Sequence, residues 1–241
     1  MPRVPARRPV AQPRLRLLIS AGPTREPIDP VRFLSNASTG AMGAALAGEA
    51  IRRRHRVTVV SGPITERLPA GARVLQVQDA RQMARALRRE APRADAIIMA
   101  AAVADFRPVR VSPVKLKRRS RLTLVLEATP EIIGRLPRRP GQVVAGFALE
   151  PPPVVRRAVR KLREKRLDLV LAQQVGGGEL PFGRTRVRAW LVGPRGEVGD
   201  LGRLSKPAVA RVFLDTIERL WVARALGIPS EPLACGGVAK W

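Results

Sequence analysis

The sequence contains few cysteine, histidine and aromatic residues for a chain of 241 residues. It has one cysteine, Cys235, one histidine, His55, and no tyrosine. A single cysteine forms no internal disulfide, and Cys235 lies in a glycine-rich tail, so we interpret it as incidental and not as a nucleophile. We expect His55 on the surface between a helix and a strand. These shortages exclude a zinc site of paired cysteines and a Ser-His-Asp triad.

The sequence also has no long apolar run and no secretion signal. The first residues, MPRVPARRPVAQPR, carry arginines but no apolar core. No hydrophobic stretch approaches the roughly 20 residues that span a bilayer. We therefore predict a cytoplasmic protein that does not bind membranes. Its expected parts are a basic disordered lead-in over residues 1–14, one domain over residues 15–225, and a tail over residues 226–241.

The charge is strongly unbalanced, with 45 Lys and Arg against 19 Asp and Glu and a net charge of +26. Such a balance suggests nucleic-acid binding. However, arginine occurs in almost every segment, and aromatic residues, at 3%, are too few for a stacking platform. We interpret the excess as a solvated surface and keep a nucleic-acid-binding α/β protein as an alternative. Lysine is scarce, which makes each lysine informative, because a compact ammonium suits a polyphosphate. The lysines are Lys115, Lys117, Lys161, Lys165, Lys206 and Lys240.

Short apolar segments alternate with longer amphipathic ones. Strands are predicted over residues 15–20, 56–62, 73–77, 94–106, 122–127, 142–148, 167–173 and 186–192. Helices are predicted over residues 38–54, 79–90, 154–166 and 206–225, with a short one from Pro130. This alternation indicates a single Rossmann-like α/β domain, a mainly parallel sheet with helices on both faces. Ligands of such sheets bind at the carboxyl ends of the strands.

The segment STGAMG, residues 38–43, follows the first long loop and opens a predicted helix. Ser38 and Thr39 lie at the expected cap, and Gly40 and Gly43 leave the backbone N–H groups open to an anion. The alternative is that the glycines only allow close packing of the helix on the sheet. Asn36 precedes this segment, and asparagine in a turn commonly bonds its own backbone.

The segment MAAAVADFRP, residues 99–108, ends a buried strand with small residues and an aspartate. The small residues leave room for a flat ligand, and Asp105 can accept hydrogen bonds from a ribose or help to hold a metal ion. Capping of a turn is the alternative for Asp105. Lys115 and Lys117 follow in the next loop, which favours a phosphate role. Lys161 and Lys165 share one helix face, for which the residues alone favour exposure to solvent.

Taken together, the segments AGPTREPIDPVRFLSN, STGAMG, AAAVADFRP, KLK, TPEII, GFALE and KLREKRLDLVLA resemble the phosphopantothenate-cysteine ligase family, also called phosphopantothenoylcysteine synthetase. The resemblance runs from about residue 15 to 220, without the decarboxylase domain fused to many members. It implies a homodimer in coenzyme A biosynthesis that joins 4'-phosphopantothenate to L-cysteine. The acid is activated by CTP with Mg²⁺ as an acyl-cytidylate, with ATP as the alternative nucleotide. A separate decarboxylase chain is a possible partner.

The same resemblance implies roles for individual residues. Asn36 holds the acyl-nucleotide and serves the amide-forming step, and Lys115 stabilises charge on the triphosphate. The implied nucleotide site consists of Met99, Ala100, Ala101, Asp105, Lys115, Pro130, Glu131, Ile132, Ile133, Phe147, Lys161 and Lys165. The implied substrate and phosphate loop consists of Ser38, Thr39, Gly40 and Gly43.

The sequence departs from the family pattern at a few positions. Ala37 and Ala41 stand where members often have histidine and lysine, and Gln173 and Gln174 stand where they have an Asn-Asp pair. A later segment, FGRTRVRAW, lacks the usual acidic flap, and we expect Arg184 or Arg186 to replace the missing cation. These changes favour a second alternative, a non-catalytic nucleotide-binding relative. The intact Asn36 and Lys115 favour the enzyme.

Overall fold

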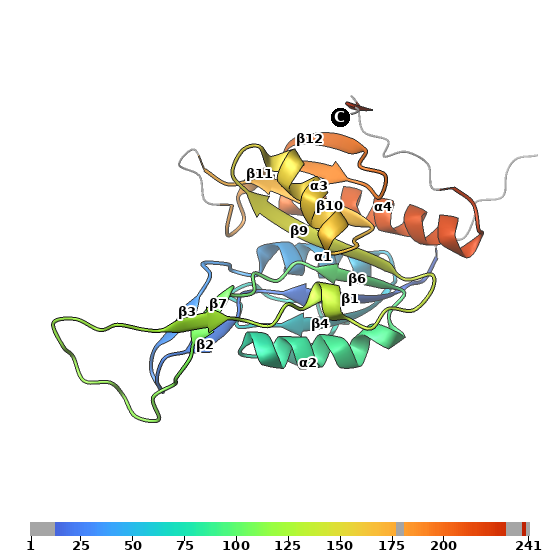
Figure 1. Cartoon of the computed structure of the whole chain (residues 1–241). Coiled ribbons are helices and arrows are strands. Elements are labelled where there is room, and N and C mark those ends of the chain that lie inside the picture. Colours follow the sequence, from blue (N-terminus) through green and yellow to red (C-terminus); the bar gives the residue numbers. More distant parts are fainter. Residues whose placement is uncertain (1–12, 177–180, 230–237, 240–241) are drawn as a thin grey trace, which may run out of the picture.

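The computed structural model describes residues 13–176, 181–229 and 238–239 (Figure 1). Residues 1–12 of the predicted lead-in lie outside the described residues. So do residues 230–237 and 240–241 of the predicted tail, which include Cys235. Within the described residues, one large sheet carries helices on both faces. The predicted fold class, a Rossmann-like α/β sheet, is confirmed.

The large sheet has the strand order β13-β12-β11-β10-β9-β6-β1-β4-β5 over the described residues. Its parallel part consists of β1 (Arg16–Ala21), β4 (Arg56–Ser61), β5 (Arg73–Gln76), β6 (Ala96–Met99), β9 (Val143–Glu150) and β10 (Leu169–Gln174). An antiparallel extension consists of β11 (Arg186–Val192), β12 (Val198–Ser205) and β13 (Val238–Ala239). The central strands are continuously apolar because helices cover both of their faces. As a result, the carboxyl ends of β1, β6, β9 and β10 meet at one edge.

Two helices cover each face of the sheet (Figure 1). α1 (Ala41–Arg52) and α4 (Lys206–Ala225) bury their apolar sides against one face. α2 (Ala80–Glu90) and α3 (Val154–Glu164) pack on the other, and the short 3₁₀ turn η1 (Ala91–Arg93) follows α2. The α2 cap is local, since the Asp79 side chain accepts a hydrogen bond of 2.7 Å from the N–H of Gln82. In the described part of the chain, no helix is both long and apolar enough to cross a membrane.

The structure differs from the predicted elements between Met99 and the start of β9. The strand predicted over residues 94–106 ends at Met99, because the following chain turns to pair Ala102 with Pro23 beyond β1. The strand predicted over residues 122–127 does not join the large sheet. Instead β8 (Leu126–Ala128) pairs with β7 (Phe106–Pro108) in a separate antiparallel pair. A second small antiparallel pair joins β2 (Arg25–Pro27) to β3 (Phe33–Ser35), in a segment that was predicted as a loop.

The helix predicted from Pro130 is also wrong. Only a single 3₁₀ turn, η2 (Ile133–Arg135), forms there. The following residues include Pro137 and Pro140, and a proline inside a helix removes a backbone donor and clashes with the preceding turn. The segment therefore crosses the sheet edge as irregular chain.

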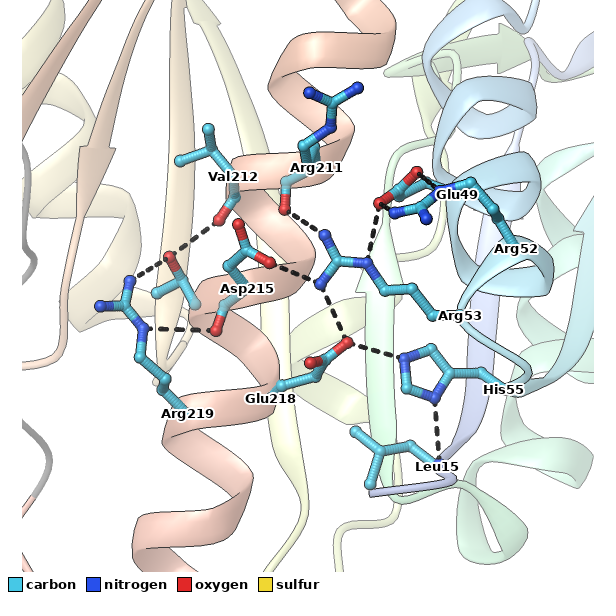
Figure 2. A network of polar contacts seen from close by, with 11 residues as sticks. Leu15, Glu49, Arg52, Arg53, His55, Arg211, Val212, Asp215, Glu218 and Arg219 are labelled. Carbon is cyan, nitrogen blue, oxygen red and sulfur yellow. Dashed lines mark hydrogen bonds and ion pairs between the residues drawn. The ribbon is translucent and has the colours of Figure 1, made fainter. Parts of the chain in front are cut away.

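A polar network ties the end of α1 to the middle of α4 (Figure 2). The Arg53 guanidinium bonds Glu49 at 2.8 Å and Glu218 at 3.0 Å. His55 is 4% exposed, so its predicted place on the surface is wrong. The N–H of Leu15 donates to Nδ1 of His55 at 3.2 Å, and the opposite nitrogen, Nε2, therefore donates to Glu218 at 2.9 Å. This network fixes α1, whose other end faces the edge where the strands finish.

Candidate active site

A cavity of about 800 Å³ lies at the carboxyl edge of β6, β9 and β10. Its wall includes the segment that leads into α1, the chain after β6, the segment around η2, the end of α3, the ends of β9 and β10, residues 181–183 and the start of α4. Most of the residues predicted for the site line it together. These are Asn36, Ser38, Thr39, Met99, Ala100, Ala101, Asp105, Pro130, Glu131, Ile132, Ile133, Phe147, Lys161 and Lys165.

Asn36 is held by the chain that follows β6. Its Nδ2 donates to the carbonyl oxygens of Ala102 and Val103, each at 3.1 Å. The local turn interpretation is therefore wrong, because the amide bonds residues 66 and 67 positions away and not its own turn. Both N–H groups of the amide are used, which fixes the plane of the side chain. Its Oδ1 is an acceptor with no donor among the described residues.

Buried hydroxyls hold the chain after Met99 in its irregular course. The Ser20 hydroxyl accepts from the N–H of Ala101 at 3.1 Å, and the Thr24 hydroxyl accepts from the N–H of Ala104 at 3.0 Å. Both hydroxyl residues are fully buried. Because the side chains at residues 100–102 are methyl groups, this backbone lies at the cavity wall with little to cover it. A flat ring can approach it closely.

Lys161 of α3 and Lys165, which directly follows α3, line the cavity, although the residues alone had favoured exposure to solvent. Lys165 donates to Glu131 at 2.9 Å, and the Glu131 carboxylate also accepts from the N–H of Gly134 at 2.9 Å. Lys161 makes no hydrogen bond or ion pair to any described residue. Burial lowers the pKa of Lys161, Lys165 adds to the shift, and Glu150 and Asp105 oppose it. The lysines thus form a cationic wall with one free ammonium.

The start of α1 differs from the predicted phosphate loop. The helix begins at Ala41, and its cap residue is Gly40, whose φ of 85° lies in the left-handed region that glycine tolerates. A Cβ on Gly43 would meet the Cβ of Ala21 at 2.4 Å. Gly43 therefore allows α1 to pack closely on β1, which was the alternative interpretation of this glycine. Gly40 and Gly43 do not line the cavity, whereas Ser38 and Thr39 do.

Lys115 does not line the cavity of its own chain. It is exposed on the long segment between β7 and β8, which projects away from the sheet (Figure 1). Arg184 and Arg186 do not line it either. Arg184 pairs with Glu66 at 3.2 Å, and Arg186 donates to the carbonyl of Arg203 at 2.7 Å.

Four polar residues that line the cavity were not predicted for the site: Thr129, Glu150, Gln173 and Lys206. Of these, Gln173 and Lys206 are the two that are buried. Gln173 is the last residue but one of β10 and is 8% exposed. Lys206 opens α4 and is 5% exposed. Two signals were present in the sequence: Lys206 is one of the scarce lysines, and Gln173 is a polar residue at the end of an apolar strand. Neither position stood out without knowledge that β10 and α4 reach the same edge.

The sheet order, the helices on both faces and the cavity at the strand ends define a Rossmann-like α/β protein. The sequence profile of the DNA/pantothenate metabolism flavoprotein C-terminal domain matches residues 13–220. The chain belongs to this family. The resemblance stated from the motifs is therefore confirmed.

Individual relatives agree with this assignment. The chain is 37% identical over 218 residues to the coenzyme A biosynthesis bifunctional protein CoaBC of Mycobacterium bovis, covering 84% of the chain and 51% of the relative. It is 38% identical over 207 residues to CoaBC of Bacillus subtilis, covering 85% and 51%. The crystal structure of the C-terminal domain of CoaBC superposes with a TM-score of 0.71 at 35% identity, over 86% of this chain and 96% of that one. The chain thus spans about half the length of these curated relatives.

Proposed function

We propose that the chain is a ligase that joins 4'-phosphopantothenate to L-cysteine through an acyl-nucleotide in coenzyme A biosynthesis. The observation that carries the proposal is the single cavity in which the Asn36 carboxamide and the ammonium groups of Lys161 and Lys165 meet at the strand ends. The similarity to CoaBC proteins of coenzyme A biosynthesis supports it. A cytoplasmic location and a separate decarboxylase chain as partner stay predictions.

In the first step, a carboxylate oxygen of the acid attacks the α-phosphorus of CTP, and the bond from that phosphorus to pyrophosphate breaks. Lys161 and Lys165 stabilise the charge that moves onto the pyrophosphate. Lys161 is suited to this because its ammonium has no ion-pair partner among the described residues. The Lys165 ammonium lies 2.9 Å from a carboxylate oxygen of Glu131. It therefore has to leave this ion pair in order to bind a phosphate oxygen.

The proposal includes Mg²⁺ bound with the nucleotide. No described residues form a group of three metal-ligating side chains, but Mg²⁺ is commonly held by one or two carboxylates together with phosphates of the substrate. Asp105 and Glu150 both line the cavity, and neither forms an ion pair with a described residue, so they fit this donor set. When bound, the ion would neutralise charge on the leaving pyrophosphate.

In the second step, the amine of cysteine attacks the acyl carbon, the bond from that carbon to the CMP oxygen breaks, and the amine loses a proton. Asn36 is positioned for this step, because its amide is fixed by two carbonyls and leaves Oδ1 free to accept a hydrogen bond. A fixed dipole costs no reorganisation at the moment of reaction. The role proposed for Asn36 is to hold the intermediate and the attacking amine together.

A homodimer forms part of the proposal because Lys115 does not reach the cavity of its own chain. The segment that carries it presents exposed apolar side chains, including Val109, Val111, Val114 and Val125. Several exposed apolar side chains on one segment favour contact with another protein surface. We place Lys115 at the triphosphate of the partner chain.

The proposal is tested with purified protein, 4'-phosphopantothenate, cysteine and each nucleoside triphosphate in turn, followed by mass spectrometry. We expect phosphopantothenoylcysteine, CMP and pyrophosphate in equal amounts, with CTP preferred over ATP. Absence of the amide product with every nucleotide would contradict the proposed function.

A further inference from the structure

The cavity has a second polar end, formed by Gln173 and Lys206. Gln173 lies on the same side of β10 as Leu171, which packs with α1 and α4. The Gln173 side chain is buried, and its Nε2 has no hydrogen-bond partner among the described residues. Buried amides are almost always paired, because a buried donor that lacks an acceptor has lost its hydrogen bonds to water without replacement. An unpaired amide in a cavity wall indicates that a ligand supplies the acceptor.

Lys206 adds a positive charge to the same end. Its ammonium donates to the carbonyl oxygens of Pro181, at 2.8 Å, and Gly183. Both acceptors are neutral, and no described carboxylate pairs with this ammonium. Burial lowers the pKa of Lys206, and Glu66 opposes the shift. The lysine is also the first residue of α4, where the helix dipole is positive. This end of the cavity therefore favours an anion.

The two cationic ends lie on opposite faces of the sheet. Lys161 belongs to α3 and Lys165 directly follows it, and α3 packs with α2 on one face. Gln173 and Lys206 lie on the face covered by α1 and α4. Asn36, Ser38 and Thr39 precede α1 and line the same cavity. If the triphosphate binds beside Lys161 and Lys165, then Gln173 and Lys206 are left to bind a different anionic group. That group would lie near the start of α1.

We propose that Gln173 and Lys206 bind the α-carboxylate of the amino-acid substrate. This inference rests on the proposed function, in which the cavity holds an amine nucleophile beside the activated acid. A carboxylate only accepts hydrogen bonds, and an amide N–H and an ammonium only donate here. Phe147, Phe182 and Met42 line the cavity as well and provide apolar surface for a thiol side chain. Binding through the carboxylate leaves the amine free to attack.

Cysteamine, which is cysteine without its carboxylate, tests this assignment together with the variant Gln173→Leu. The wild-type protein should prefer cysteine to cysteamine in kcat/KM. Gln173→Leu should lower kcat/KM for cysteine about 10–100-fold through a raised KM, the loss expected for a hydrogen bond to a charged group. The reaction with cysteamine and the release of pyrophosphate from CTP should keep their wild-type rates.

Two further variants complete the experiment. Gln174→Leu is the matched control, because Gln174 is the next residue of β10, is exposed and does not line this cavity. It should change neither substrate's kinetics. Lys206→Met should reduce the preference for cysteine in the same way as Gln173→Leu.

Three outcomes would overturn the inference. Equal losses with cysteine and cysteamine would show a structural effect, and an unchanged preference would remove Gln173 from the carboxylate site. A raised KM for phosphopantothenate during pyrophosphate release would place the phosphate of that acid at this end instead. Failure of the wild-type protein to release pyrophosphate is a different result, since it contradicts the proposed function before any variant is compared.

Discussion

At the scale of single residues, the site depends on side chains whose positions are fixed by distant backbone. Asn36 is oriented by the carbonyls of Ala102 and Val103. The residues on either side of that pair, Ala101 and Ala104, donate their N–H groups to the hydroxyls of buried Ser20 and Thr24. Such indirect support is what a reacting group needs, because an error of about 1 Å in its position costs much of its effect. Asn36 is therefore a side chain with a fixed amide and one free acceptor.

We predict that Asn36→Ala releases pyrophosphate from CTP and phosphopantothenate at near the wild-type rate but forms the amide at least about 100-fold more slowly. The activation step does not use the Asn36 acceptor, whereas attack by the amine does. Rapid quenching followed by separate measurement of pyrophosphate and amide distinguishes the two steps. A variant that loses pyrophosphate release would show that Asn36 serves the first step.

Most residues of the cavity could be predicted from the sequence through its resemblance to a known family. For Lys161 and Lys165 the residues alone favoured exposure to solvent, and only the family motifs placed them in the site. Gln173 was noted only as a departure from those motifs. Its burial depends on how β10 packs against its neighbours and on the arrival of α4 at the same edge, neither of which a local pattern contains. His55 was misplaced for the same reason, since its partner Glu218 is 163 residues away.

At the scale of elements, the network between α1 and α4 supports the face that carries Asn36, Gln173 and Lys206 (Figure 2). The Glu218 carboxylate joins His55 and Arg53, and its side chain is 13% exposed. Burial raises the pKa of Glu218, but the hydrogen bonds from His55 and Arg53 outweigh it, so the pKa lies below its ordinary value of 4.5. The Arg52 guanidinium is the largest cause that lowers the pKa of Glu49 to about 2.

A carboxylate with a lowered pKa stabilises the fold above its unfolded pKa, and this contribution is lost as the pH falls through the folded value. We therefore expect the melting temperature to be highest above pH 4.5 and to decline as the pH falls from 4.5 towards 2. Glu218→Gln should reduce the free energy of unfolding at neutral pH by about 2 kcal/mol, because buried His55 and Arg53 lose a charged partner. It should also flatten the decline at low pH.

The matched control is Asp215→Asn, which removes a neighbouring carboxylate that also pairs with Arg53 but is 51% exposed. Exposed pairs contribute about 0–1 kcal/mol, so this variant should change the melting temperature little. Thermal unfolding of the variants between pH 2 and pH 8 provides the comparison. Equal destabilisation by both substitutions would contradict the role given to Glu218.

Regular elements were predictable where the apolar pattern was continuous. The last helix has the predicted bounds, and each strand of the parallel sheet except β6 begins and ends within a few residues of its predicted range. The misplaced elements lie between Met99 and Val143, where β7, β8 and η2 form, and the short strands β2, β3 and β13 and the longer β12 were not predicted. The course of the misplaced elements is set by hydrogen bonds to other segments, such as the one from the Thr129 hydroxyl to the carbonyl of Ala104 at 2.6 Å. Local propensity does not contain this information.

At the scale of the whole molecule, the position of Lys115 is the strongest indication that one chain does not make a complete site. The segment that carries it leaves the body of the domain, and its exposed valines have no covering surface in the described chain. A site shared between two chains would explain both observations. A shared site also predicts that two inactive variants can complement each other in a mixed dimer.

We predict that Asn36→Ala and Lys115→Gln, each inactive in amide formation, restore activity when the two proteins are denatured, mixed and refolded together. In a mixed dimer, one cavity then combines Asn36 of one chain with Lys115 of the other. Recovery of up to about a quarter of the wild-type rate follows from random pairing, in which half of the dimers are mixed and each has one intact site. Failure of the mixture to recover activity would place Lys115 in its own chain's site or outside the reaction.

The central claim is that the cavity converts a carboxylate into a mixed anhydride with a nucleoside monophosphate. Phosphopantothenate labelled with oxygen-18 in its carboxylate tests this directly, because the oxygen that attacks the α-phosphorus stays with the nucleotide when the amide forms. We predict one labelled oxygen in the phosphate of CMP and none in pyrophosphate, measured by mass spectrometry after one turnover. Label in inorganic phosphate, or none in the nucleotide, would contradict the account.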